Sequence, residues 1–281
     1  MKYVSADQDR QIREVMRRCG QQAQALAQSF QVFQKGAGDY VTNVDRLLDQ
    51  ELLRTFAGLF PDDGIITEEN FSSQAAFGLD YQRLWCIDPL DGTEDFIQHK
   101  SYYAIMVGLL ANFMPVAGWV YGPYQDELYY GGPDWGLFQV RGEEPPAPLI
   151  AIEPSLPGVN RQFPIVLGEK DQRNFGPAIV EAVPGAFFYS LGSFGLKVLE
   201  VIQGRAGLYI YLNGRVKLWD TTGPLALAKA AGLVCCDLTG RPLEWTPDWI
   251  EADTLIHKQA IMVGWPGYVE TFGPKIQAAV Q

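Results

Sequence analysis

Residues 85–96 read WCIDPLDGTEDF, and the acids and glycine of this stretch decide how the rest of the chain is interpreted. The apolar run 84–87 predicts a buried strand that stops at Asp88, because the proline that follows has no N–H to continue a ladder. Asp91 comes next around a turn, and Gly92 lets the backbone turn tightly and aim amide N–H groups at an anion. Two carboxylates and such amides at the end of a strand suit a divalent cation together with a phosphate.

Three further clusters stand in a fixed order around this stretch. They are Asp45 at the end of VTNVD (41–45), Glu68 and Glu69 at the end of GIITEE (64–69), and Asp220 in WDTTGP (219–224). Together with the Asp-Pro-x-Asp-Gly-Thr motif, they resemble the inositol monophosphatase family of Mg²⁺-dependent, Li⁺-sensitive phosphatases. The resemblance implies an α/β (α+β) fold, a layered αβαβα sandwich of the inositol monophosphatase/fructose-1,6-bisphosphatase type.

The family pattern implies that oxygen atoms of these clusters bind two or three Mg²⁺ ions per site. The implied ligands are Glu68, Asp88 and the Leu90 carbonyl for a first ion, Asp88, Asp91 and Asp220 for a second, and Glu68 with Glu69 for a third, weaker one. Oxygen ligands around partly hydrated ions suit Mg²⁺ better than zinc. Each acid alone is as easily read as a turn residue, since Asp-Gly and Asp-Pro are common turn pairs. Four clusters in family order favour the ligand interpretation.

The same resemblance implies the catalytic roles. Thr93, linked to Asp45, would orient and deprotonate a water activated by the metal, and the amides of Gly92 and Thr93 would bind the phosphate. Without the resemblance, Asp45 reads as an ordinary acid in the first turn of a helix. The only histidines, His99 and His257, stand in no catalytic motif, and no nucleophile elbow, Walker A loop or dinucleotide fingerprint occurs.

Composition and charge exclude several classes of partner. The 281 residues are 47% hydrophobic and 20% charged, as in an ordinary soluble enzyme, and the formal net charge is −11. This charge argues against a nucleic-acid polymer or a membrane as partner, and an anionic substrate would need bound cations to reverse the local sign. The four cysteines, Cys19, Cys86, Cys235 and Cys236, show neither zinc-site nor disulfide spacing. Reduced thiols and the lack of an apolar signal core predict a cytoplasmic protein.

The order of predicted elements divides the chain into two halves that form a single compact catalytic unit. Residues 1–145 are expected to form an N-terminal α+β half with most metal ligands, and 158–281 a C-terminal α/β half with Asp220 and the substrate contacts. The Pro-rich segment 143–157 would join them across the surface. Helical spacing after a Ser5 cap predicts a first helix, which the glycine-rich, mobile segment 35–39 would end.

The remaining elements follow from apolar periodicity and turn residues. They are a helix at 43–59, strands at 65–67, 102–111, 115–121, 127–131, 135–141 and 163–167, a helix at 174–183, a strand at 187–191, a helix at 193–203, a strand at 206–212, a helix at 221–231, strands at 233–237 and 260–263, and a helix at 268–280. The strands between residues 102 and 141 predict a mostly antiparallel sheet. The later alternation of strands and helices predicts an α/β layer.

The substrate is the point at which the sequence leaves alternatives open. Inositol monophosphatases carry a Glu seven residues before the aspartate of Trp-Asp, where it contacts an inositol hydroxyl, but this chain has Asn213. The segments 192–197 and 217–220 instead resemble the 3'(2'),5'-bisphosphate nucleotidase (CysQ-like) branch. The predicted substrate contacts are Gly92, Thr93, Gly192, Ser193, Lys197, Asn213 and Lys217. Lys197 or Lys217 would neutralise a second phosphate, or both are solvated surface residues.

These features predict a small phosphorylated metabolite as substrate, with adenosine 3',5'-bisphosphate as the first choice. An inositol-1-monophosphatase or a fructose-1,6-bisphosphatase-like sugar phosphatase is the alternative within the same chemistry. A non-catalytic metal-binding regulator is the alternative from another class, although such a protein has no need of the Asp45/Thr93 pair. Many members of the family are dimers, and a homodimer is expected here by analogy alone.

Overall fold

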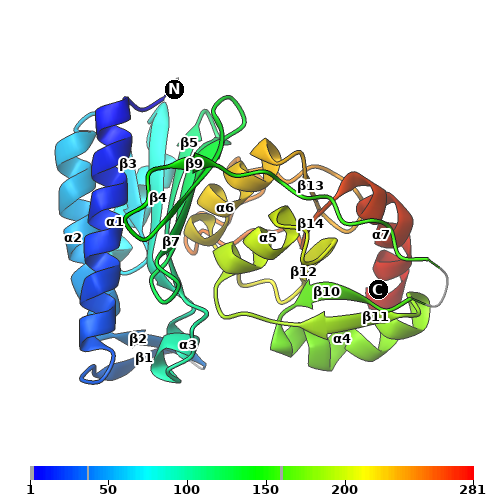
Figure 1. Cartoon of the computed structure of the whole chain (residues 1–281). Coiled ribbons are helices and arrows are strands. Elements are labelled where there is room, and N and C mark those ends of the chain that lie inside the picture. The colour runs from blue at the N-terminus through cyan, green and yellow to red at the C-terminus, as the bar shows by residue number, and fades with distance from the viewer. Residues whose placement is uncertain (1–2, 37, 159–160) are drawn as a thin grey trace.

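The computed structural model describes residues 3–36, 38–158 and 161–281, and they form five layers (Figure 1). In order, the layers are helices α1 (Ala6–Leu26) and α2 (Asn43–Leu59), a seven-stranded sheet, helices α5 (Phe194–Ile202) and α6 (Leu218–Ala230), a five-stranded sheet, and helices α4 (Glu169–Ala182) and α7 (Pro266–Val280). This arrangement confirms the predicted αβαβα sandwich. None of the helices in the described ranges has the length and apolar character that a membrane span requires.

The seven-stranded sheet packs against the helix layer that contains α6 and its acid Asp220. Its strands, in spatial order, are β3 (Gly64–Thr67), β4 (Arg83–Asp91), β5 (Ala104–Ala111), β6 (Met114–Gly122), β7 (Glu127–Gly132), β8 (Gly136–Arg141) and β9 (Ala147–Pro148). Only β3 and β4 pair in parallel, and every other neighbouring pair in this sheet is antiparallel. The predicted antiparallel sheet is therefore confirmed, with β9 as an additional short edge strand.

The prediction that the strand stops at Asp88 is wrong, because β4 passes through a bulge and continues to Asp91. Asp88 pairs with Met106, and Asp91 pairs with Ala104, so three steps on β4 match two steps on β5. A bulge of this kind bends the strand and re-aims its side chains. The proline that was expected to end the ladder lies inside the bulge, where its missing N–H removes no ladder bond.

The five-stranded sheet has the order β11 (Ala186–Tyr189), β10 (Phe163–Leu167), β12 (Leu208–Tyr211), β14 (Ile261–Gly264) and β13 (Val234–Cys236). The first three strands are parallel, and β14 runs antiparallel to both of its neighbours. Alternating strands and helices build this part of the chain, as the sequence predicts. Side chains from both halves share one core, for example Met106 and Val120 with Val198, Ile210 and Met262.

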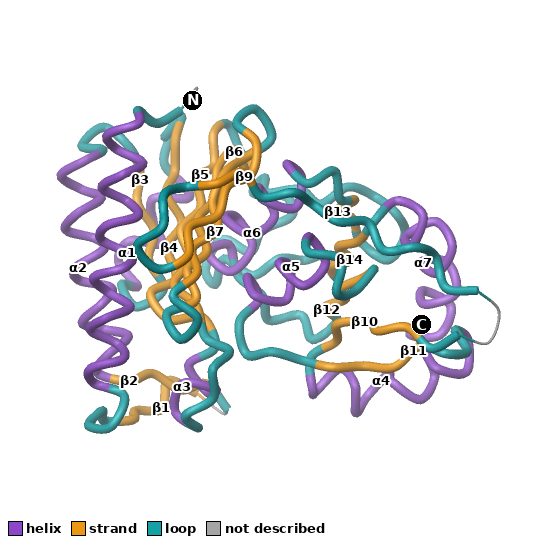
Figure 2. Tube along the Cα trace, viewed as in Figure 1, coloured by secondary structure: helices purple, strands orange, loops and turns teal. Residues whose placement is uncertain are grey.

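The segment 35–39 does not end the first helix as predicted, because α1 already ends at Leu26. Strands β1 (Val32–Gly36) and β2 (Asp39–Thr42) pair as an antiparallel hairpin, and Ala37 of that prediction lies outside the described residues. Figure 2 shows this hairpin next to α3 (Thr93–Ile97), the short helix that follows the bulge, and β2 contacts α3. The hairpin therefore borders the end of β4 that carries Asp88 and Asp91.

Close backbone contact fixes helix α6 on the seven-stranded sheet. A Cβ atom on Gly108 would lie 2.3 Å from the Gly223 nitrogen, and one on Gly118 would lie 2.1 Å from the Gly223 oxygen. Real Cβ atoms do not approach other atoms so closely, so no larger residue fits at either sheet position without moving the helix. The contact holds the first turn of α6, with Asp220, at a set distance from β4.

Candidate metal centre and substrate pocket

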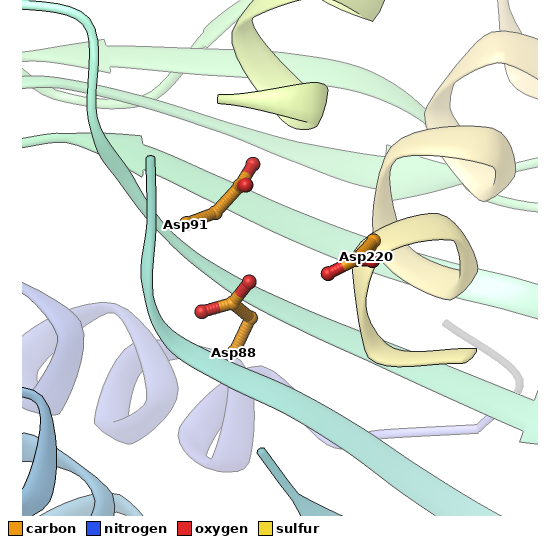
Figure 3. A group of neighbouring side chains, drawn as sticks. All are labelled: Asp88, Asp91 and Asp220. Carbon is orange, nitrogen blue, oxygen red and sulfur yellow. The ribbon is translucent and has the colours of Figure 1, made fainter. Parts of the chain in front are cut away.

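Three aspartates from distant parts of the chain form the centre of the site. Asp88 and Asp91 come from the bulged end of β4, and Asp220 comes from the first turn of α6. Each offers one carboxylate oxygen, and these atoms all lie within 4.8 Å of one another. Figure 3 shows the three side chains around a common space, which Asp88 and Asp91 enter from one side and Asp220 from the other.

Backbone amides hold two of these carboxylates in place. Asp88 Oδ1 accepts the Leu90 N–H at 2.9 Å, and Asp220 Oδ2 accepts the Lys217 N–H at 2.7 Å. The Lys217 bond also caps the N-terminus of α6, so the helix begins three residues before the predicted start at 221. In each carboxylate the second oxygen accepts no hydrogen bond within the described residues and is left for a ligand.

Ser193 and Gly195 hold the third carboxylate. Asp91 Oδ2 accepts the Ser193 hydroxyl at 2.6 Å and the Gly195 N–H at 3.3 Å. The Ser193 hydroxyl also caps α5 by accepting the Leu196 N–H at 3.1 Å, and its side chain is fully buried. Ser193 is predicted from the sequence as a substrate contact, but in the structure its hydroxyl caps α5 and donates to Asp91, a predicted metal ligand.

Burial and mutual repulsion make this cluster unfavourable without a cation. Burial, followed by the charges of Glu68, Asp91 and Asp220, raises the pKa of Asp88 well above its ordinary value. Burial is also the main cause that raises the pKa of Asp91 to about 6 and the pKa of Asp220 well above its usual range. Carboxylates in such surroundings either hold protons or share a cation, and a divalent ion satisfies several of them at once. The donor set therefore fits Mg²⁺.

A pocket of about 230 Å³ brings the other predicted ligands to the same place. Its lining includes Glu68, Asp88, Leu90, Asp91, Gly92, Thr93 and Asp220. Residues of the β1–β2 hairpin, Asp39 and Tyr40, close one side of it. The ligand sets predicted for the first and second Mg²⁺ ions thus border one cavity.

Lys35, on strand β1, occupies the place where the sequence predicts a third ion. Its Nζ lies 2.9 Å from Glu68 Oε1 and 2.5 Å from Glu69 Oε1. Burial lowers the pKa of Lys35, but the charges of Glu68 and Glu69 outweigh it and raise that pKa overall. The ammonium group therefore remains charged and competes with a cation for these two carboxylates.

Replacing Lys35 by Met should strengthen the binding of the weakest Mg²⁺ ion. The variant keeps most of the side-chain volume but removes the charge that pairs with Glu68 and Glu69. We expect the weakest dissociation constant to fall roughly tenfold, which corresponds to about 1.4 kcal/mol. Calorimetric titration with Mg²⁺ at pH 8 would measure it, with Lys35→Arg as a charge-preserving control. Identical isotherms for wild type and Lys35→Met would contradict this competition.

Thr93 and Asp45 form the predicted pair. The Thr93 hydroxyl lies 2.9 Å from Asp45 Oδ1 and 3.0 Å from the Leu90 carbonyl oxygen, and it can donate its one hydrogen to either. Asp45 is 1% exposed, and its other oxygen accepts the Thr42 N–H at 2.9 Å and the Thr42 hydroxyl at 2.5 Å. Burial raises the pKa of Asp45 although these donors oppose the shift. Thr93 lines the 230 Å³ pocket, and when it donates to Asp45 its hydroxyl oxygen can still accept a hydrogen from water.

Gly92 meets two backbone requirements at the same point. Its φ is +89°, in the left-handed region, and a Cβ there would lie 3.0 Å from both the Ser193 nitrogen and the Tyr102 oxygen. Only glycine satisfies both conditions. The turn that was predicted at this residue is thereby fixed between β4 and α3.

A second pocket, of about 380 Å³, adjoins the first and shares Gly92 and Glu94 with it. Four of the predicted substrate contacts line it, namely Gly92, Gly192, Lys197 and Asn213. Lys217 lines neither pocket, and its Nζ lies 5.0 Å from the centre of the Trp219 ring. The second pocket is thus the place where a substrate body can extend from the metal centre.

Several residues in or beside the two pockets were not predicted from the sequence. They are Lys35 and Asp49 beside Glu69, and Lys100, Lys170, Asp171 and Arg173 in the larger pocket. Asp49 alone had a local signal, because it follows Asp45 by four residues and so lies on the same face of α2. The others belong to segments with no motif, and only the folded chain brings them to the site.

Comparisons with known proteins support the resemblance to the inositol monophosphatase family. A model of the inositol monophosphatase family matches residues 6–264. An inositol monophosphatase of Mesembryanthemum crystallinum is 27% identical over 234 residues, which cover 81% of this chain and 84% of the relative. A 3'(2'),5'-bisphosphate nucleotidase CysQ of Haemophilus influenzae is 26% identical over 224 residues, 80% of each chain. The solved structure of an IMPase/NADP phosphatase complexed with Mg²⁺ and phosphate has a TM-score of 0.76 at 20% identity, covering 95% of this chain and 94% of that one.

The structural likeness establishes a shared fold, and the two curated relatives have nearly the same identity to this chain although their names give different substrates. The match to the family model spans nearly all of the chain and includes every predicted metal ligand. The sequence-based expectations of family and of enzyme class are confirmed. The chain belongs to the inositol monophosphatase family, and it is a phosphatase, a phosphoric monoester hydrolase.

Proposed function

We propose that this phosphatase is a Mg²⁺-dependent 3'(2'),5'-bisphosphate nucleotidase whose preferred substrate is adenosine 3',5'-bisphosphate. The inositol monophosphatase family is Mg²⁺-dependent. The observation that carries the choice of substrate is Asn213 in the wall of the 380 Å³ pocket, where the inositol-binding pattern has a carboxylate. An amide can donate to a ring nitrogen or accept from an amino group, whereas it is a weaker acceptor for a sugar hydroxyl than a carboxylate.

The chain's own residues would act on a phosphate as follows. Glu68, Asp88, the Leu90 carbonyl, Asp91 and Asp220 would hold two Mg²⁺ ions. When bound, these ions would supply positive charge for the phosphate and lower the pKa of a water. Thr93 Oγ1, with its hydrogen directed at Asp45, would accept a hydrogen from that water and orient it. The Gly92 and Thr93 amides, at the start of α3, would bind the phosphate.

The alternatives differ in what the second pocket would recognise. An inositol-1-monophosphatase or a fructose-1,6-bisphosphatase-like enzyme would use the same metal ligands with a sugar in the 380 Å³ pocket. A non-catalytic regulator would have no use for the Thr93–Asp45 hydrogen bond of 2.9 Å. That bond is why we favour an active enzyme.

A panel of substrates tests the proposal. We expect kcat/KM for adenosine 3',5'-bisphosphate to exceed that for inositol 1-phosphate by about tenfold or more, since one well-formed charged contact contributes about 1.5–3 kcal/mol. Fructose 1,6-bisphosphate and AMP complete the panel, and Li⁺ is expected to inhibit turnover of each substrate that is hydrolysed. A clear preference for inositol 1-phosphate would overturn the nucleotidase assignment and leave the metal chemistry standing.

Location and assembly remain predictions. The four cysteines are buried and unbonded, which suits the reducing cytoplasm. A homodimer is expected from the family, and light scattering of the purified protein would test it.

A further inference from the structure

We propose that Lys170 and Arg173, on the first turns of α4, form a second anion subsite that recognises the remaining phosphate of a bisphosphate substrate. The inference rests on the proposed phosphatase function and assigns a specificity role to residues that the sequence did not single out. Four cations line the 380 Å³ pocket, namely Lys100, Lys170, Arg173 and Lys197. These four side chains differ in whether other protein groups already pair with their charge. By this criterion, Lys170 and Arg173 are the two that can bind a ligand.

Lys197 has a charge that the protein already balances. Its side chain is buried, with 8% of the residue exposed, and its Nζ donates to the Gly192 carbonyl at 3.2 Å. Carboxylates surround it, and those that act on its pKa are Asp91, Asp95, Asp171 and Asp220. Burial nevertheless lowers the pKa of Lys197 overall. An ammonium in this position compensates the acids of the metal centre, so it is poorly suited to be the main partner of a further phosphate.

Lys100 is also engaged. Its Nζ lies 3.2 Å from Asp95 Oδ1, within the loop that follows α3. By contrast, Lys170 and Arg173 are exposed, and neither forms an ion pair or a side-chain hydrogen bond with any residue that the structure describes. They are therefore the two cations of this pocket that are available to a ligand.

The position of Lys170 links the two pockets. Its Nζ lies 3.8 Å from the point that a Cβ on Gly38 would occupy, which places it against the β1–β2 hairpin although α4 belongs to the other half of the chain. Gly38 also lines the 230 Å³ metal pocket. Lys170 thus lies where the metal pocket meets the larger one, and Arg173, three residues later, lies on the same face of the helix.

Buried contacts fix the helical turn that presents these two residues. Asp171 is 2% exposed, and its Oδ2 accepts the Leu212 N–H at 2.9 Å. Gln172 Nε2 donates to the Leu167 carbonyl at 2.7 Å. Both residues stand between Lys170 and Arg173 in the sequence. The start of α4 is therefore anchored on β10 and on the segment after β12. The backbone that carries the two cations is therefore fixed before a ligand binds, so binding needs to order only their side chains.

The charge of the pocket explains why two cations are needed. Glu94 and Glu169 also line it, and the chain as a whole has a net charge of −11. A phosphate that lies outside the reach of the metal ions would be repelled by this background. Arg173 can bind a phosphate through two parallel N–H donors, and Lys170 adds a compact charge on the side toward the metals.

Kinetics on two related nucleotides test the subsite. Adenosine 3',5'-bisphosphate and 3'-AMP share the cleaved ester and differ only in the 5'-phosphate. We expect Lys170→Met and Arg173→Met each to lower kcat/KM for the bisphosphate about tenfold more than for 3'-AMP, mainly through KM. Lys275→Met, which removes an exposed charge from α7, is the control for net charge and should leave both values unchanged. Equal losses on both nucleotides, or no loss on either, would overturn the subsite.

A binding measurement separates this inference from the proposed function. In an Asp45→Asn background, calorimetry with Mg²⁺ should show the bisphosphate bound at least tenfold more tightly than 3'-AMP. Adding Lys170→Met and Arg173→Met should remove that difference. If it is absent from the start, the subsite is wrong even when phosphatase activity is present. If it is present but the wild type turns over neither nucleotide, the subsite stands and the nucleotidase assignment fails.

Discussion

Asp91→Asn should abolish Mg²⁺-dependent phosphatase activity and leave the fold intact. Losing a direct ligand should weaken Mg²⁺ binding about 100-fold and lower turnover on the order of 1,000-fold or more. The amide keeps an oxygen that can accept the Ser193 hydroxyl and the Gly195 N–H, which hold the native side chain at 2.6 and 3.3 Å. Packing around the side chain is therefore preserved.

The same variant should be at least as stable as wild type when no metal is present. Burial raises the pKa of Asp91, and the charge of Glu68 adds to this shift, although Ser193, Lys197 and Gly195 oppose it. The charge of Asp91 in turn raises the pKa of Asp88 and Asp220. Removing one of several like charges within a few ångströms relieves a repulsion of about 1–3 kcal/mol at an effective dielectric constant near 20. Mg²⁺ should stabilise the wild type much more than the variant, because binding to the native state alone raises stability.

Phosphate release, Mg²⁺ calorimetry and thermal unfolding with and without EDTA would measure these effects. Asp80→Asn provides a matched control, because Asp80 is an exposed acid that lines neither pocket. Full wild-type turnover in EDTA would refute the metal requirement. A variant that unfolds in EDTA well below the wild type would show that Asp91 serves the fold instead.

Thr93→Ala and Asp45→Asn should each lower kcat by a factor of about 100 to 10,000 while phosphate affinity changes little. Thr93 Oγ1 is the group that can accept a hydrogen from the attacking water, and Asp45 Oδ1, 2.9 Å away, determines where the hydroxyl hydrogen points. Because the two act as one unit, the double variant should lose little more than either single one. A double loss equal to the product of the single losses would show that they act independently.

Two controls keep this test specific. Thr93→Ser retains the hydroxyl and should keep much of the activity. Thr55→Ala removes a hydroxyl on the same helix as Asp45 and should have no effect on kcat. Within the described part of the chain, that hydroxyl bonds only the Glu51 carbonyl, at 2.9 Å. Asp45 also accepts two bonds from Thr42 at the start of α2, so Asp45→Asn should cost about 1 kcal/mol of stability, which urea denaturation would reveal separately.

Elements whose signals are local could be predicted from the sequence with little error. Helix α2 spans Asn43–Leu59 and strand β10 spans Phe163–Leu167, both as the apolar periodicity and the flanking residues indicate. The ordered acid motifs, too, were sufficient to predict the family, the layered fold and the phosphatase class. In each of these cases, the residues that carry the signal lie close together in the sequence or form a recurring motif.

Local signals were insufficient where a distant segment supplies the partner. The stop predicted at Asp88 is wrong because β5 continues to pair with β4 beyond the bulge, and α6 begins at Leu218 because Asp220 reaches back to cap it. The segment 35–39 was expected to end the first helix, yet that helix stops at Leu26, β1 pairs with β2, and Lys35 forms ion pairs with Glu68 and Glu69. The energy of strand pairing and of ion pairs depends on how close the two partners lie in space. The sequence pattern of either partner alone does not contain this distance.

The sequence by itself determined which acids could bind metal and which residue pair could activate water, because those groups recur in a recognisable order. Only the tertiary structure decided the use of the cations. It places Lys197 among carboxylates and pairs Lys35 with two glutamates. Among the residues that the structure describes, it gives Lys170 and Arg173 no ion-pair partner at the 380 Å³ pocket. A charged side chain can bind a ligand to the extent that neighbouring charges do not already compensate it. Folding brings those neighbours together from residues far apart in the chain.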